Sequence, residues 1–110
     1  MTWPSDADGD VLRRLELSGF DFSKPALIDF NVDFQSWPPP AAAIAALSRH
    51  YSSVRAYEPD GEFAGYLQFQ VFARITHELV INIQREITNL MSSYDGECSS
   101  WGVLSPAQPG

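Results

Sequence analysis

The stretch Ile28-Asp29-Phe30-Asn31-Val32-Asp33-Phe34 alternates strictly between apolar and polar residues. Successive side chains of a β-strand point to opposite faces, so this pattern predicts a strand whose apolar residues face a core. The two aspartates and the asparagine then lie together on the opposite face. Any function of that face begins with carboxylate and amide groups.

Signals for six further elements surround this strand, which we place at residues 27–35. Three segments show apolar residues at helical spacing, and three others alternate or are bounded by turn residues. The predicted helices are 5–19, 41–51 and 77–92, and the predicted strands are 53–58, 65–73 and 97–104.

The order of the last six elements is the split βαβ arrangement of the ferredoxin-like sandwich. The predicted fold is therefore α+β: a βαββαβ sandwich with a four-stranded antiparallel sheet and two helices on one face. Leu67, Phe69 and Val71 would share the core with the apolar row of 27–35. The helix at 5–19 precedes this unit, and we expect it to cover a sheet edge or part of the open face.

The length of 110 residues predicts one domain over 1–110, with an ordered core over about 6–104 and a flexible tail at 105–110. The first residues lack the pattern of a secretory signal, and no apolar run reaches the roughly 20 residues that span a bilayer. Cys98 is the single cysteine, which excludes an intrachain disulfide. We therefore expect a cytoplasmic protein.

The charge balance favours a basic partner. Fourteen acidic residues stand against seven basic ones, which gives a net charge of −7. The basic residues are scattered along the chain, so we expect no direct binding of nucleic acid. The alternative is that the charge only keeps the protein soluble.

The open face of the predicted sheet is the candidate binding site. RNA-recognition modules of this topology stack bases on aromatic residues there, but carboxylates on the neighbouring strand would repel phosphates. A polypeptide that carries arginine suits the face better, because carboxylates pair with guanidinium groups in forked geometry. The candidate partner-binding residues are Asp29, Asn31, Asp33, Tyr66, Gln68, Gln70 and Phe72.

Catalytic and metal-binding signals are weak. His50, near the end of the second predicted helix, and His77, expected to face solvent, lack partners at metal-ligand spacing, so we predict no metal and no cofactor. The segments 8–10 and 60–62 fit a helix start and a hairpin turn better than calcium loops. Cys98 fits a small buried residue, and no nucleophile, base and oxyanion site can be assembled. We predict that the protein is not an enzyme.

Four segments carry a resemblance to a known family. Gly19-Phe20-Asp21-Phe22, the strand at 28–34, Tyr94-Asp95-Gly96 and Trp101-Gly102 occur in an order that resembles the regulator of ribonuclease activity B (RraB) family, the ribonuclease E inhibitors. The resemblance covers about residues 10–104. On physical grounds, Trp101 is expected to be a buried anchor and Gly102 a backbone position that needs to lack a Cβ.

The resemblance implies a non-catalytic cytoplasmic regulator of ferredoxin-like fold that binds ribonuclease E and inhibits its processing of RNA. It thereby supplies a basic partner, because the non-catalytic region of that enzyme is rich in arginine. The alternative, from another functional class, is a module that self-associates or binds a small ligand. Sheets of this fold often dimerise, and a homodimer would occupy the same face.

Overall fold

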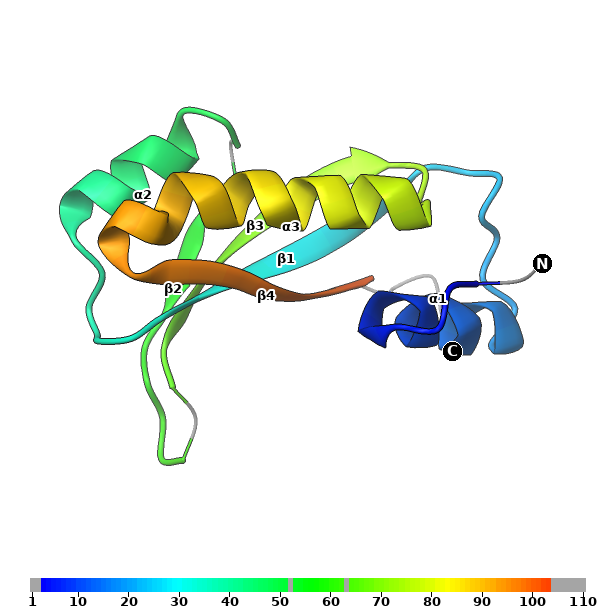
Figure 1. The fold of residues 1–110 in the computed structure, drawn as a ribbon, viewed down its shortest axis with the longest axis horizontal. Helices are drawn as coiled ribbons and strands as arrows, with labels where there is room; N and C mark the ends of the chain where they lie inside the picture. Colours follow the sequence, from blue (N-terminus) through cyan, green and yellow to red (C-terminus); the bar gives the residue numbers. More distant parts are fainter. Residues whose placement is uncertain (1–2, 52, 63, 104–110) are drawn as a thin grey trace.

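The computed structural model describes residues 3–51, 53–62 and 64–103. These residues form three α-helices, one short 3-10 helix and four strands, as ordered in Figure 1. These are α1 (Ala7–Leu17), β1 (Ala26–Phe34), α2 (Ala41–Ser48), β2 (Arg55–Tyr57), β3 (Tyr66–Ala73), α3 (His77–Met91), η1 (Ser92–Tyr94) and β4 (Gly96–Val103).

The strands form one antiparallel sheet in the order β2-β3-β1-β4. Helices α2 and α3 lie on the same face of this sheet, and the β2–β3 hairpin projects away from the body (Figure 1). This is the topology of a ferredoxin-like α+β sandwich, as the order of elements predicted.

The alternation in β1 is confirmed by burial. Ile28, Phe30 and Val32 have no exposed surface, and neither do Leu67 and Phe69 of the adjacent β3. The rings of Phe30 and Phe69 stack with their centroids 5.3 Å apart. Because β1 is central and pairs with both β3 and β4, its apolar row forms the floor of the core beneath the helices.

Several predicted boundaries differ from those observed. The helix expected over 41–51 ends at Ser48, after which the His50 N–H donates to the Leu47 carbonyl, three residues back instead of the four of an α-helix. The strand expected over 53–58 shortens to Arg55–Tyr57, which is as far as its pairing with β3 extends. The predicted end of the last strand at residue 104 and the tail at 105–110 lie outside the described residues.

The added helix α1 lies beside α3 and the C-terminal end of β4 (Figure 1). Leu12 enters the core with no exposed surface. The Asp8 carboxylate accepts hydrogen bonds from Trp101 Nε1 at 2.8 Å and from Gln84 Nε2 at 3.0 Å. These contacts attach α1 to the β4 edge of the sheet, on the side of the helices. Of the two positions that the sequence allowed, a sheet edge or part of the open face, the structure shows the edge.

His77 corrects one prediction. It was expected to face solvent, but only 23% of its side chain is exposed, and Nε2 lies 3.0 Å from Oδ2 of Asp6. Asp6 caps α1 by accepting a hydrogen bond from the backbone N–H of Gly9. Two contacts hold the pKa of Asp6 below its ordinary value. The larger cause is the hydrogen bond from Gly9, and the smaller is the contact with His77. Asp6 thus joins the N-terminal ends of α1 and α3.

The two residues of the closing Trp-Gly pair have different roles. Trp101 is 7% exposed and is bonded to α1 through its indole N–H, which confirms it as a buried anchor. The expectation for Gly102 is wrong: a Cβ added there would meet no described atom within 4 Å. Gly102 lies in an extended strand opposite Asp29, so neither packing nor backbone conformation requires glycine.

Candidate binding face

The predicted site residues all lie on the open face of the sheet, opposite α2 and α3. Asp29 pairs with Gln70, Asn31 with Gln68, and Asp33 with Tyr66. Phe72 faces Leu27 at the other end of the same pair of strands. Since neighbouring residues of a strand alternate between faces, this register places the whole predicted set on one surface.

Hydrogen bonds across the strands fix the polar side chains of this face. Gln70 Nε2 donates to Asp29 Oδ1 at 2.7 Å, and Gln68 Nε2 donates to Asn31 Oδ1 at 3.0 Å. Asn31 Nδ2 in turn donates to Ser100 Oγ at 3.0 Å on β4. The amides thereby hold the acceptor oxygens in place, and each carboxylate keeps further lone pairs for donors from a partner.

A bulge in β4 adds residues that sequence reasoning missed. Asn31 pairs with Ser100 while Val32 pairs with Cys98, so Ser99 is an extra residue between them. Its hydroxyl donates to the carboxylate of Asp33. Bulges are set by pairing between distant strands, and no local pattern in the segment 97–104 indicated this one.

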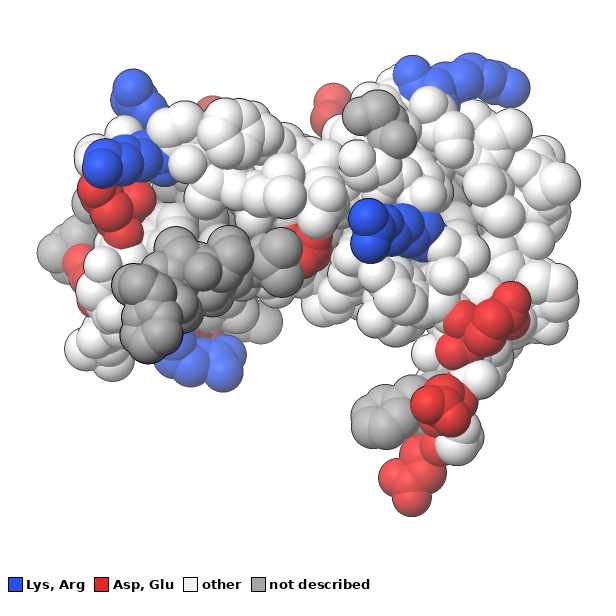
Figure 2. Space-filling view, turned by 180° about the vertical axis from the view of Figure 1, so that it is seen from behind, with Lys and Arg blue, Asp and Glu red and all other residues white. Residues whose placement is uncertain are grey.

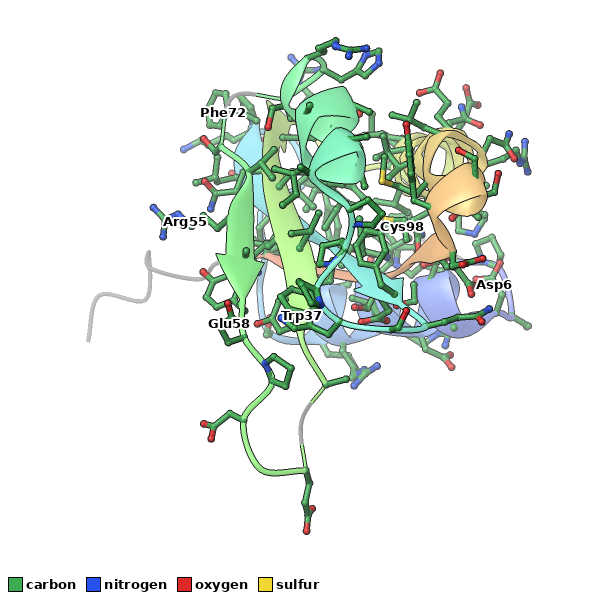
Figure 3. The ribbon with its side chains drawn as sticks, turned by 90° about the vertical axis from the view of Figure 1, so that its left-hand side faces the viewer. Asp6, Trp37, Arg55, Glu58, Phe72 and Cys98 are labelled. Atoms are coloured by element: carbon green, nitrogen blue, oxygen red, sulfur yellow. The ribbon has the colours of Figure 1, made fainter. Side chains whose placement is uncertain are left out.

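The short strand β2 also contributes side chains to the face. Arg55 pairs with Gln68, and Tyr57 pairs with Tyr66. The two tyrosine rings stack with centroids 5.0 Å apart and an interplanar angle of 18°. Figure 3 shows Arg55 and Phe72 on the side of the sheet turned away from α2 and α3. The turn-bounded segment 53–58 was predicted as a strand, but without register its facing residues could not be assigned.

The two ends of the open face carry different side chains. Asp33 and Glu97 are directly opposite each other at one end of the face. At the other end, Leu27 and Phe72 are 36% and 69% exposed. A partner that covers the whole face therefore meets carboxylates at one end and apolar side chains at the other.

Acidic residues also gather outside this face. In the view from behind, they lie along the projecting β2–β3 hairpin, while much of the body is uncharged (Figure 2). The hairpin contains Glu58, Asp60 and Glu62, all exposed. The Glu58 carboxylate accepts a hydrogen bond at 2.7 Å from the Trp37 indole, and Figure 3 shows these two side chains close together near the end of β2. The net charge of the protein is therefore spread well beyond the predicted site.

Cys98 is buried, as predicted, with 5% of its surface exposed. Burial, with a smaller contribution from Asp33 and the nearby Asp8 and Glu97, raises the pKa of its thiol to about 12. Such a thiol is protonated at neutral pH and is a poor nucleophile. Across the described residues, no cluster of His, Cys, Asp or Glu could hold a metal ion, and no helix has the length and apolar character to cross a membrane.

Comparison with known proteins identifies a family for this chain. A family model described as regulator of ribonuclease activity B matches residues 5–103 of the 110-residue chain. No curated protein and no solved structure matches the chain. The matched range runs from the residues before α1 to the end of β4, so the candidate face lies entirely within it.

Proposed function

Because the chain belongs to the regulator of ribonuclease activity B family, we propose that it regulates RNA processing without catalysis by binding a basic protein partner. The partner that this family implies is ribonuclease E. The binding surface is the open face of the sheet, from the pair Asp29–Gln70 to the pair Asp33–Tyr66.

The observation that carries this proposal is the hydrogen-bonded ladder of the open face. Gln70 holds the carboxylate of Asp29, and Ser99 holds that of Asp33, so both acceptors are ordered before a partner arrives. Ordering in the free protein lowers the entropy cost of binding. Guanidinium groups of a partner would complete the coordination of these oxygens.

Charge supports a protein partner over RNA. A net charge of −7 repels a polyphosphate chain at long range and accelerates encounter with a basic polypeptide. The carboxylates of the face then act at short range. Occupation of a basic segment of ribonuclease E by this protein would deny that segment to RNA or to other partners of the enzyme.

The test is a pair of charge-reversal variants matched in net charge. Asp29→Lys with Asp33→Lys changes the open face, whereas Asp60→Lys with Glu62→Lys makes the same change on the hairpin. We expect the first pair to abolish binding to purified ribonuclease E and its inhibition, and the second pair to weaken them slightly. Equal effects of the two pairs would show that net charge alone matters.

Folding controls complete this test. Thermal unfolding should show that both double variants remain folded, because lysine stems extend along a surface and keep their charge in water. If the open-face lysines unfold the protein, Asp29→Asn with Asp33→Asn removes the charges and keeps the shape. Full inhibition by that asparagine pair would place the binding surface elsewhere.

The second candidate function is self-association. Phe72 is 69% exposed beside Leu27, and two copies that met through these residues would bury an apolar surface. Sedimentation over a range of concentrations distinguishes the two functions. A dimer dissociated by Phe72→Ser would support self-association, and a monomer at every concentration would leave the face free for a partner.

A further inference from the structure

One row of the open face combines aromatic rings with carboxylates. Tyr57 of β2 pairs with Tyr66 of β3, Tyr66 pairs with Asp33 of β1, and Asp33 pairs with Glu97 of β4. These four residues cross the whole sheet at one end. Side chains directly opposite each other in antiparallel strands have Cβ atoms about 5 Å apart, so each lies within reach of the next.

The two halves of this row differ in chemistry. On one side of Asp33, the rings of Tyr57 and Tyr66 stack with centroids 5.0 Å apart, which leaves each ring one face that the other ring does not cover. On the other side, Glu97 adds a second carboxylate. A planar cation can lie against the aromatic surface while it donates hydrogen bonds to a neighbouring carboxylate.

A hollow extends the acidic half around the edge of the sheet. It has a volume of about 360 Å³ and lies where β1 ends and β4 begins, under the last turns of α3. Asp33 and Glu97 form part of its lining together with Asp95, and the described residues that line it include no lysine or arginine. The hydroxyl-bearing Thr88 and Ser92 also line it.

Arginine fits this combination better than lysine. The guanidinium group is planar, stacks on aromatic rings and donates two parallel hydrogen bonds to a carboxylate. An ammonium group is a compact, strongly hydrated charge that gains less from an aromatic surface. A surface of carboxylates alone would attract both cations, whereas the stacked tyrosines favour arginine.

We propose that Tyr57, Tyr66, Asp33 and Glu97 form a subsite that recognises an arginine side chain of the protein partner. This inference rests on the proposed function and specifies which chemistry of the partner is recognised. The guanidinium group lies against the tyrosine pair and donates to Asp33. Glu97 and the adjoining hollow receive a second basic side chain of the same segment.

Two synthetic peptides of equal charge test the subsite with the full chain. One carries three arginines in a Gly-Ser background, and the other carries lysines at the same positions. In fluorescence titrations, we expect the arginine peptide to bind about fivefold more tightly, since stacking on an aromatic face distinguishes the cations. Chemical-shift changes of the protein on titration should centre on Tyr66, Asp33 and Glu97.

Variants separate stacking from charge. Tyr66→Leu should remove the preference for arginine by weakening the arginine peptide more than the lysine peptide, and Tyr57→Leu provides the same test if the first variant fails to fold. Asp33→Asn should weaken both peptides. Asp60→Asn, with the same change of charge on the hairpin, should affect both peptides only slightly.

The outcomes of this experiment and of the ribonuclease E experiment can be distinguished. Equal affinity of the two peptides, or shifts centred on the hairpin, would overturn the arginine subsite even if ribonuclease E binds the open face. A preference for arginine that depends on Tyr66, with no binding of ribonuclease E, would support the subsite and replace the partner with another arginine-bearing protein.

Discussion

The bond between Trp101 and Asp8 should contribute measurably to stability, because it joins the last strand to the added helix. Trp101 Nε1 donates to Asp8 Oδ1 at 2.8 Å, and the tryptophan is 7% exposed. Trp101→Phe removes the donor and part of the ring, and Asp8→Ala removes the acceptor. The coupling free energy from the double-mutant cycle of these two substitutions separates the contribution of the hydrogen bond from that of lost packing.

The expected magnitude follows from the partners. A hydrogen bond to a charged group contributes about 1.5–3 kcal/mol to stability. Gln84 also donates to Asp8 Oδ1, so the carboxylate keeps one hydrogen bond when Trp101 is substituted. We therefore expect a coupling energy of about 1–2 kcal/mol. Trp101→Phe alone should cost about 2–3 kcal/mol, because it also leaves space beside the core.

Urea unfolding monitored by circular dichroism measures all four proteins of this cycle. A matched control is Trp3→Phe, because Trp3 Nε1 also donates to a carboxylate, that of Glu16, at 3.2 Å but in an exposed position. The control should cost less than about 0.5 kcal/mol. Additive effects of the Trp101 and Asp8 substitutions would refute the assignment of this bond as the attachment of α1.

Three further predictions concern other contacts. Gly65→Ala should cost about 1–3 kcal/mol in urea unfolding, because the new Cβ would lie 2.6 Å from the Trp37 ring, whereas Gly102→Ala should be neutral or stabilising since its Cβ would meet nothing. Asp6 has a lowered pKa in the folded protein, so its charge stabilises the fold above about pH 4 and less as the pH falls below that value. In thermal unfolding, Asp6→Asn should therefore be less stable than the natural chain at pH 6, and the difference should shrink as the pH falls below about 4. Cys98 should react with a thiol reagent at pH 8 only as fast as the protein opens, and rapid labelling in native buffer would contradict its burial.

The fold was predictable because its signals are local. The period of two in 28–34 placed a strand and its buried face. The start of α3 is also specified locally, because the Thr76 hydroxyl accepts a hydrogen bond from the Leu79 N–H at 3.0 Å. Asp95 adopts a left-handed conformation with φ of 61° and ends the 3-10 turn before β4.

The composition of the candidate face was only partly predictable. Asp29 and Gln70 were assigned to it from alternation within their own strands, and the structure pairs them. Ser99 reaches the face through the bulge, and Tyr57 reaches it through the register of an edge strand three residues long. Both features depend on which residues of distant strands are opposite each other, which composition and periodicity do not encode.

The motifs that revealed the family serve mainly the interior. A Cβ on Gly96 would lie 2.6 Å from the ring of Phe34 and 3.0 Å from Met91 Cβ, so the close approach of β4 to its neighbours requires glycine there. Trp101 of β4 holds α1 in place through its hydrogen bond to Asp8. Both residues lie within the range 5–103 that the family model matches.

The outward-facing positions are under no such constraint. Substitution of Asp33, Glu97 or Tyr66 changes the chemistry of the open face while the buried residues between them still specify the sheet. Two chains with this interior can therefore share a fold and differ in partner. On our proposal, the outward residues of the four strands select the partner of this protein, and the aromatic and acidic row that they form favours a segment that contains arginine.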